Sequence, residues 1–267
     1  MNILKNYTII LVQPLESLNV GMVARAMKNM GCLELIIVDP KDYKPEKALW
    51  TACHAVDVIE GIQIVSTLEK ALETFTNVVG FCGVYKNRED DIKTLFQWVS
   101  KEKELEKELD THNLQKNKTA LVFGPEDTGL RDEHLYYCRE LVTIPVAGDY
   151  ASFNIAQAVL VTLFELQREF LMGLKIKAES TPGGGVGYEQ SSESKSSIAV
   201  LATWKDYAQL DHTVDAALAA ISFYNSGTTR QLPKMVKNMF RAVAVTRRQA
   251  QVLQGIFGRV VKVVVGG

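Results

Sequence analysis

Six short apolar runs recur along the first 174 residues of this 267-residue chain, and stretches with helical character separate them. Most of the runs are rich in Val, Ile and Leu without apolar–polar alternation, as expected of parallel strands covered on both faces. This order predicts an α/β fold with a mainly parallel sheet and helices on both faces. The predicted strands are Tyr7–Val12, Glu34–Asp39, Gln63–Val65, Asn77–Cys82, Thr119–Phe123 and Leu141–Val146.

Two predicted helices of this region differ in character. Ser152–Leu174 is long and apolar on more than one face, so it is expected to be buried against the sheet or a partner subunit. Ser100–Asp110 carries Lys and Glu side chains at i, i+4 spacing and is interpreted as a solvated helix end.

The rest of the chain is expected to form a second unit. Residues 176–197 are dense in Gly and Ser and predict a flexible linker, which separates a domain at 1–175 from a helical extension at 198–267. The helices expected there are Ile198–Leu210, Thr213–Asn225 and Pro233–Gly255. Their expected core consists of Leu201, Trp204, Tyr207, Leu210, Leu218, Ile221 and Phe223.

Charge is unevenly distributed. After Asp215 lie eight of the 30 Lys and Arg residues and none of the 31 Asp and Glu residues, so the preceding part has 22 basic against 31 acidic residues. A basic tail on an acidic body is typical of polyanion binding, and a solvated helix face is an equally good interpretation. The tail includes Arg241, Arg247 and Arg248.

Composition argues against several other classes of protein. The four cysteines form no Cys-x-x-Cys pair and no Cys/His ligand spacing, which favours free thiols in a reducing cytoplasm and no metal site. No run of about 18 apolar residues occurs, so no membrane span is expected. No Gly-x-Gly-x-x-Gly motif follows the first strand, which argues against a nucleotide-binding oxidoreductase.

A first block of small and polar residues runs from Asn19 to Arg25. Asn19 is a favoured N-cap residue and Gly31 a favoured C′ residue, so a helix is predicted over Val20–Met30. A Gly inside a helix costs about 1 kcal/mol relative to Ala. Gly21 is therefore interpreted as a place where an RNA phosphate or ribose approaches the backbone beside Arg25; the alternative is that Arg25 is an ordinary surface residue.

Two further blocks follow later strands. In Phe123-Gly124-Pro125-Glu126, Gly124 is expected to adopt a backbone shape closed to other residues. Glu126 is interpreted as capping backbone N–H groups or holding a loop at the start of the next helix, in preference to acid–base chemistry. After Ile144-Pro145, Ser152 and Asn154 are expected to open the long helix, where N-capping by Ser152 and ligand binding are compatible roles.

In this order the three blocks resemble the motifs of the SpoU–TrmH branch of the SPOUT RNA methyltransferases, over residues 1–174. The Tyr150–Asn154 context and the helical extension are similar to the TrmJ-like tRNA (cytidine/uridine-2′-O-)-methyltransferases. The resemblance implies a C-terminal trefoil knot built from the loops at 81–83, 124–126 and 144–154, with S-adenosylmethionine bound by them. It also implies a homodimer with a shared site. The implied donor-binding residues are Cys82, Gly83, Gly124, Glu126, Ile144, Ser152 and Phe153.

The same resemblance gives Arg25 the role of activating a ribose 2′-hydroxyl. A guanidinium is a poor base at neutral pH, so we interpret Arg25 as stabilising a developing 2′-oxyanion and clamping a neighbouring phosphate. Asn19, Ser152 and Asn154 are the other catalytic candidates, expected to orient Arg25 and the ribose. The candidate RNA contacts are Arg25, Lys28, Arg241, Arg247 and Arg248.

The function implied is S-adenosylmethionine-dependent 2′-O-methylation of a tRNA pyrimidine at position 32 in the anticodon loop, as part of cytoplasmic tRNA processing. One alternative is 2′-O-methylation of ribosomal RNA or of another tRNA position. Another is a non-catalytic RNA-binding protein that has kept the knot. The presence of Asn19, Arg25, Glu126, Ser152 and Asn154 together argues against this second alternative.

Overall fold

A seven-stranded sheet forms the centre of the computed structural model, which describes residues 3–83, 92–108, 118–147, 153–179, 200–223, 236–237, 239–240 and 245–265. The strand order is β3-β2-β1-β6-β4-β7-β5, and each neighbouring pair is parallel. The predicted α/β class with a parallel sheet is confirmed. The strands are β1 Tyr7–Val12, β2 Glu34–Val38, β3 Gln63–Val65, β4 Asn77–Phe81, β5 Ile92–Thr94, β6 Thr119–Phe123 and β7 Glu140–Thr143.

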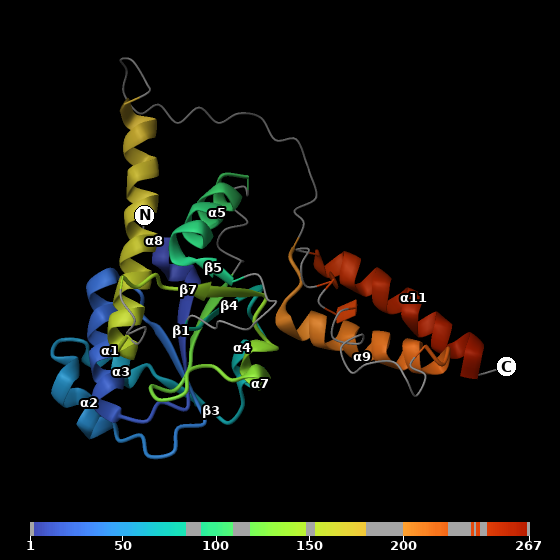
Figure 1. The fold of residues 1–267 in the computed structure, drawn as a ribbon, viewed down its shortest axis with the longest axis horizontal. Helices are drawn as coiled ribbons and strands as arrows, with labels where there is room; N and C mark the ends of the chain where they lie inside the picture. Colours follow the sequence, from blue (N-terminus) through green and yellow to red (C-terminus); the bar gives the residue numbers. More distant parts are fainter. Residues whose placement is uncertain are drawn as a thin grey trace.

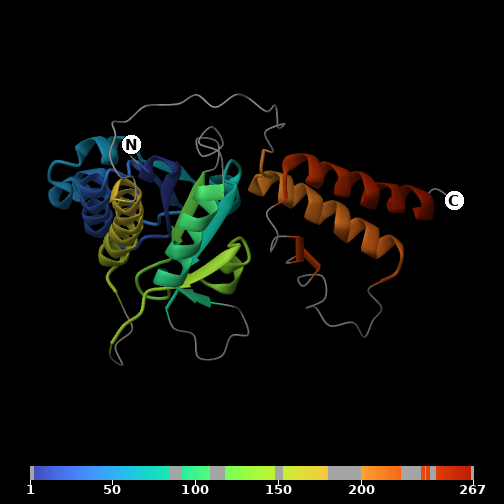
Figure 2. The ribbon, with the colours of Figure 1, turned by 90° about the horizontal axis from the view of Figure 1, so that it is seen from above.

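Helices cover both faces of the sheet (Figures 1 and 2). In β1, Ile9 and Leu11 join the apolar cluster on one face, and Ile10 and Val12 join the cluster on the other. Because every side chain of the strand is buried, its sequence has no period of two. The first cluster lies under α1 Ser17–Met30, α2 Pro45–Ala52, α3 Val56–Glu60, α5 Leu95–Glu108 and α8 Ile155–Glu179; the second lies under α4 Leu68–Leu72 and α7 Asp132–Leu135. A 3₁₀ turn, η1 Ile3–Asn6, precedes β1.

The sheet differs from the prediction at one edge. Strand β5 was not predicted, because its three residues form no apolar run and only the pairing with β7 makes them a strand. Strand β7 was expected to continue to Val146, but it ends at Thr143. Pro145 follows one residue later, lacks an N–H group for the ladder and restricts the residue before it.

The interpretation of Ser100–Asp110 as a solvated face is wrong at Glu102, which is 8% exposed. The Tyr7 hydroxyl and the Asn77 amide donate hydrogen bonds to its carboxylate, each at 3.4 Å. Burial raises the pKa of Glu102 to about 7, and the nearby Glu140 carboxylate adds to the effect. Glu102 is therefore a buried acid on the inner side of α5, although the sequence around it has the charge pattern of an exposed helix.

Helix α8 begins later than predicted and ends later. It starts at Ile155, and the side-chain oxygen of Asn154 accepts a hydrogen bond from the N–H of Ala156 at 2.9 Å. Asn154 therefore caps the helix in the place expected for Ser152, which lies outside the described residues. Because α8 continues to Glu179, residues 176–179 of the predicted linker are helical. The trefoil knot and the division into domains stay predictions.

The C-terminal part, here called the helical module (described residues 200–265), contains α9 Trp204–Ala220 and α11 Arg247–Val265 side by side (Figure 2). The prediction of a helix break near residue 211 is wrong, since α9 continues through it. The third predicted helix, Pro233–Gly255, coincides with helical residues at 236–237 and 239–240 and with the first half of α11, which continues to Val265. Of the predicted core, Ile221 and Phe223 are 48% and 46% exposed, whereas Tyr207 and Leu210 are buried.

Candidate active site

Residues that follow β4, β6 and β7 at the carboxyl edge of the sheet line a cavity of about 240 Å³. Open parallel sheets bind their ligands at this edge. Every described residue predicted to bind the methyl donor lines the cavity, namely Cys82, Gly83, Gly124, Glu126, Ile144 and Phe153. Ser152 lies outside the described residues.

Aromatic rings form part of the cavity wall. Phe81 ends β4 and Phe123 ends β6, the two are directly paired in register, and their rings stack with centroids 4.4 Å apart. Sequence reasoning did not identify this pair as lining the site. The available signal was an aromatic residue at the last position of two predicted strands.

The turn after β6 folds closely on itself. A Cβ on Gly124 would lie 2.2 Å from the carbonyl carbon of Gly129 and 2.3 Å from the nitrogen of Leu130, so only glycine fits there. The predicted reason, a special backbone shape at Gly124, is wrong. The positive φ of 64° belongs to Gly129, and close approach is what requires Gly124.

Glu126 holds two loops together, which is the structural role predicted for it. One carboxylate oxygen accepts a hydrogen bond from the backbone N–H of Leu15 at 2.9 Å, and the other accepts one from the amide of Asn19 at 2.8 Å. Its predicted place at the start of the next helix is wrong, because α7 begins at Asp132 with Arg131 as its N-cap. Glu126 therefore joins the turn after β6 to the start of α1.

Asn19 is also placed differently from the prediction. Helix α1 begins at Ser17, so Asn19 lies in its first turn and does not cap it. Its side chain donates to Glu126 and accepts a hydrogen bond from the amide of Asn154 at 3.0 Å. The three motif residues thus form a chain of hydrogen bonds, Asn154–Asn19–Glu126, that fixes the three motifs to one another.

Arg25 lies on the exposed side of α1 and, within the described part of the chain, forms no hydrogen bond or ion pair. The structure therefore does not show the predicted orientation of Arg25 by Asn19 and Asn154. The close approach expected at Gly21 exists, but α2 makes it. A Cβ on Gly21 would lie 2.0 Å from the carbonyl oxygen of Ala48 and 2.2 Å from Oγ1 of Thr51. The interpretation of Gly21 as a place of RNA approach is wrong.

The other candidate RNA contacts differ in their surroundings. Lys28 forms an ion pair with Asp57, so its charge is already compensated. Arg247 forms an ion pair with Asp206 at 3.1 Å, and Arg248 is exposed. Arg241 lies outside the described residues.

Two classes of feature are missing from the described residues. They contain no group of three or more His, Cys, Asp or Glu side chains that could hold a metal ion. None of their helices combines the length and apolar character needed to cross a bilayer.

The parallel sheet with a pocket at its carboxyl edge places this protein in the class of α/β proteins that bind a ligand at the strand ends. Comparison with known proteins gives the family. The model of the SpoU rRNA Methylase family matches residues 6–164, and the chain belongs to this family.

Relatives and solved structures extend the comparison. The tRNA (cytidine/uridine/adenosine-2′-O-)-methyltransferase TrmJ of Pseudomonas aeruginosa is 28% identical over 260 residues, covering 97% of this chain and 95% of the relative. LasT of Escherichia coli K12, called an uncharacterized tRNA/rRNA methyltransferase, is 35% identical over 159 residues, 60% of this chain and 67% of the relative. The crystal structure of TrmJ from Z. mobilis shares the fold, with a TM-score of 0.71, 19% identity and coverage of 94% and 97%.

The methyl donor of this chain is S-adenosylmethionine, and the pocket fits it. Ile144 and the partly exposed Phe153 offer apolar surface for an adenine ring, and the buried Phe81 and Phe123 are also part of the pocket wall. Residues 124–129, the turn after β6, also line the pocket. The Glu126 carboxylate is already engaged by Leu15 and Asn19, so it supports the pocket wall.

Proposed function

We propose that this protein methylates the 2′-hydroxyl of a tRNA ribose, at the pyrimidine in position 32 of the anticodon loop. The observation that carries the proposal is the match to the P. aeruginosa tRNA 2′-O-methyltransferase along 97% of this chain, which includes the helical module. Position 32 and the pyrimidine follow from the resemblance to TrmJ-like enzymes.

S-adenosylmethionine supplies the sulfonium methyl group in this reaction. The hydrogen bonds that join Asn154, Asn19 and Glu126 support the wall of the pocket. Arg25 is free to meet a substrate, since it has no partner among the described residues. In our proposal its guanidinium binds the RNA phosphate and stabilises the 2′-oxygen as negative charge develops on it.

We further propose that the active enzyme is a homodimer formed through α1 and α8. These helices pack on each other, and each exposes large apolar side chains: Leu18 and Met22 on α1, and Leu160, Phe164 and Leu171 on α8. Exposed apolar surface of this kind is typical of an interface between subunits. Arg25 lies on the exposed side of α1 next to Met22, where it could serve the partner's pocket.

Light scattering on Phe164→Glu tests the dimer. The charge at a 54% exposed position on α8 is expected to produce monomers, whereas Phe96→Glu, at a 55% exposed position on α5, should remain dimeric. A Phe164→Glu protein that stays dimeric contradicts this interface.

The reaction is tested by transfer of tritiated methyl from S-adenosylmethionine to total tRNA and, separately, to ribosomal RNA, followed by nucleoside mass spectrometry. A 2′-O-methylpyrimidine in tRNA, mapped to position 32, is the expected result. Label in ribosomal RNA alone would favour 2′-O-methylation of ribosomal RNA, the substrate that the description of the SpoU rRNA Methylase family names. A folded, dimeric protein that labels neither would favour the non-catalytic alternative.

A further inference from the structure

Trp204, the first residue of α9, packs into the core of the methyltransferase domain (residues 3–179), away from the core of its own module. It is 8% exposed, and its ring lies against that of Tyr137 with centroids 5.1 Å apart. Its backbone N–H donates to the carbonyl of Phe75 at 2.8 Å. Figures 1 and 2 show α9 beginning beside α4 and α7.

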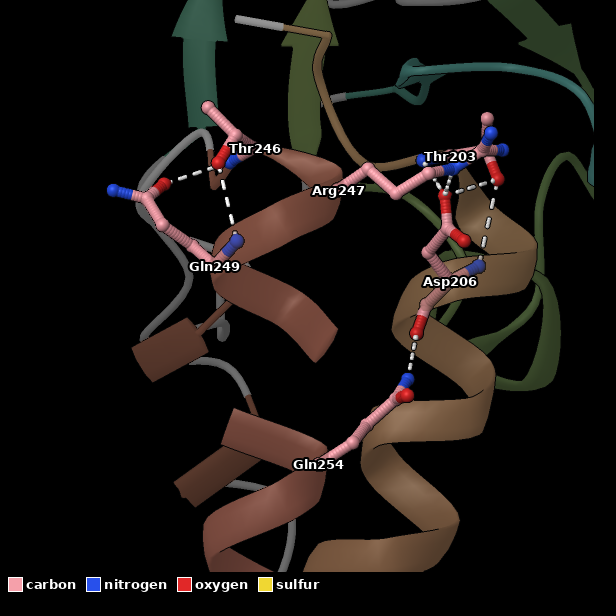
Figure 3. A network of polar contacts seen from close by, with 6 residues as sticks. All are labelled: Thr203, Asp206, Thr246, Arg247, Gln249 and Gln254. Atoms are coloured by element: carbon pink, nitrogen blue, oxygen red, sulfur yellow. Dashed lines mark hydrogen bonds and ion pairs between the residues drawn. The ribbon is translucent and has the colours of Figure 1, made fainter. Parts of the chain in front are cut away.

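Polar contacts join the first turn of α9, which begins at Trp204, to α11 (Figure 3). Thr203 and Asp206 form a capping box around the first turn of α9. Arg247, the first residue of α11, binds the Asp206 carboxylate at 3.1 Å, and Gln254 donates to the Asp206 carbonyl at 3.3 Å. Whatever fixes Trp204 therefore also fixes α11 and the exposed Arg248 next to Arg247.

One ion pair also crosses this boundary, and it is weak. Lys205 lies 4.0 Å from Glu73, and both side chains are largely exposed. Ion pairs of that kind contribute little in water. Among the described residues, Trp204 is the large apolar side chain that the module buries in the domain.

The place where Trp204 docks is linked to the cofactor pocket through the sheet. Trp204 shares a small cavity with Val78, near the start of β4, and with Tyr137 and Arg139, just before β7. The opposite ends of these two strands carry Cys82 and Ile144, which line the cofactor pocket. A module anchored where these strands begin is thus held at a fixed position relative to the pocket where they end.

We propose that Trp204 is a positioning residue that locks the helical module onto the methyltransferase domain, so that RNA bound along α11 meets the cofactor pocket in one orientation. The contacts of Trp204 support the attachment of the module whatever the function of the protein. Its consequence for RNA rests on the proposed function.

Three full-length variants test the lock. Trp204→Ala removes the docked ring. Trp204→Phe keeps an aromatic ring and loses no side-chain hydrogen bond, because Nε1 of Trp204 has no partner within the described residues. Trp50→Phe is the matched control, since Trp50 on α2 is 73% exposed.

Small-angle X-ray scattering, circular dichroism, S-adenosylmethionine affinity and the kcat and KM for tRNA are measured for each. We expect Trp204→Ala to enlarge the radius of gyration and raise the KM for tRNA at least tenfold. Its helicity and S-adenosylmethionine affinity should stay within twofold of wild type. Trp204→Phe should recover KM to within threefold, and Trp50→Phe should match wild type.

Two results would overturn the lock. One is a Trp204→Ala protein with unchanged scattering and unchanged KM. The other is a parallel loss of helicity and S-adenosylmethionine affinity in both Trp204 variants, which would assign the ring to folding alone. If wild-type protein methylates no tRNA, the proposed function fails, and the scattering comparison still decides whether Trp204 docks the module.

Discussion

The amide of Asn154 donates a hydrogen bond to the side-chain oxygen of Asn19, 3.0 Å away, and so joins two motifs that lie 135 residues apart. Asn19 in turn donates a hydrogen bond to Glu126, and the side-chain oxygen of Asn154 caps α8 by accepting one from the N–H of Ala156. These hydrogen bonds therefore join the start of α1, the turn after β6 and the N-terminus of α8 to one another.

Glu126→Gln is predicted to weaken S-adenosylmethionine binding about tenfold, which is about 1.4 kcal/mol. A glutamine keeps one acceptor oxygen and turns its NH₂ group toward either Leu15 N–H or the Asn19 amide, both of which are donors. Losing a hydrogen bond to a charged group costs about 1.5–3 kcal/mol. Part of this cost should appear as weaker cofactor binding, because Glu126 supports the pocket wall. Isothermal titration calorimetry measures the change. Glu69→Gln, an exposed carboxylate on α4, should bind as wild type; equal affinities for the two variants would contradict the role of Glu126.

Arg25→Lys is predicted to lower kcat by about 10²–10³, the usual loss when one donor to a developing oxyanion is removed. A lysine keeps the charge and loses the forked geometry that binds phosphate through two N–H groups. Single-turnover methyl transfer at neutral pH measures the effect, with S-adenosylmethionine affinity unchanged because Arg25 does not line the pocket. Lys47→Gln, an exposed cation on α2, is the control. Turnover of Arg25→Lys within threefold of wild type would refute the need for the guanidinium fork.

The central strands could be predicted well from sequence because all the side chains of β1 and β6, and all but one of those of β4, are buried. A strand such as β1 must then be apolar along its whole length, and a run of that kind is visible without any knowledge of its neighbours. Strand β5 lacks this signal, because pairing with β7 at the sheet edge is what defines it. The core of the helical module was predicted poorly, because Trp204 was assigned to it and in the structure packs into the second apolar cluster of the sheet.

The site residues were found by motif, but their roles depend on partners distant in sequence. Asn19 looked like an N-cap, and only its contact with Glu126, 107 residues away, shows that it ties loops together. Gly21 signalled a close approach correctly, and nothing local identified α2 as the element that approaches. Sequence therefore locates such residues more reliably than it assigns their contacts.

Gly21→Ala is predicted to destabilise the fold, although alanine favours helices by about 1 kcal/mol. The added Cβ would meet the Ala48 backbone at 2.0 Å, so α2 must move, and overpacking of this kind costs about 1–3 kcal/mol. Gly255→Ala, in α11 with no atom within 4 Å of the new Cβ, should stabilise by about 0.5–1 kcal/mol. Thermal and urea unfolding of the two variants should give changes of opposite sign. A stabilised Gly21→Ala protein would show that the helices do not pack so closely.

Stability is predicted to fall as pH rises from about 4.5 to about 7, through the titration of Glu102. Burial and the Glu140 carboxylate raise the pKa of Glu102 to about 7, against the opposing effects of Lys101, Tyr7 and Arg139. The neutral acid is thus favoured in the folded state. Its stabilising contribution is complete below the unfolded pKa and is lost as pH passes the folded one. A shift of this size corresponds to about 3 kcal/mol.

Glu102→Gln tests that contribution, since the amide stays neutral at every pH. Urea unfolding between pH 4 and 8 should show a smaller decline for the variant than for wild type, and a more stable variant at pH 8. Parallel stability curves for the two proteins would mean that Glu102 titrates normally.

Arg248→Gln is predicted to weaken tRNA binding and to reduce the magnitude of the slope of log K against log salt by about 1, the effect of losing one phosphate contact. Arg248 is exposed at the start of α11, so its removal leaves the module intact. Arg247→Gln also breaks the ion pair with Asp206 and should lower the melting temperature as well. Lys205→Gln, an exposed cation on α9, is the control, and filter binding at several salt concentrations measures all three. Because the Trp204 contacts fix α11 to the sheet, a lost phosphate contact there should raise the KM for tRNA with little change in kcat. An unchanged salt slope for Arg248→Gln would place the RNA on another surface of the module.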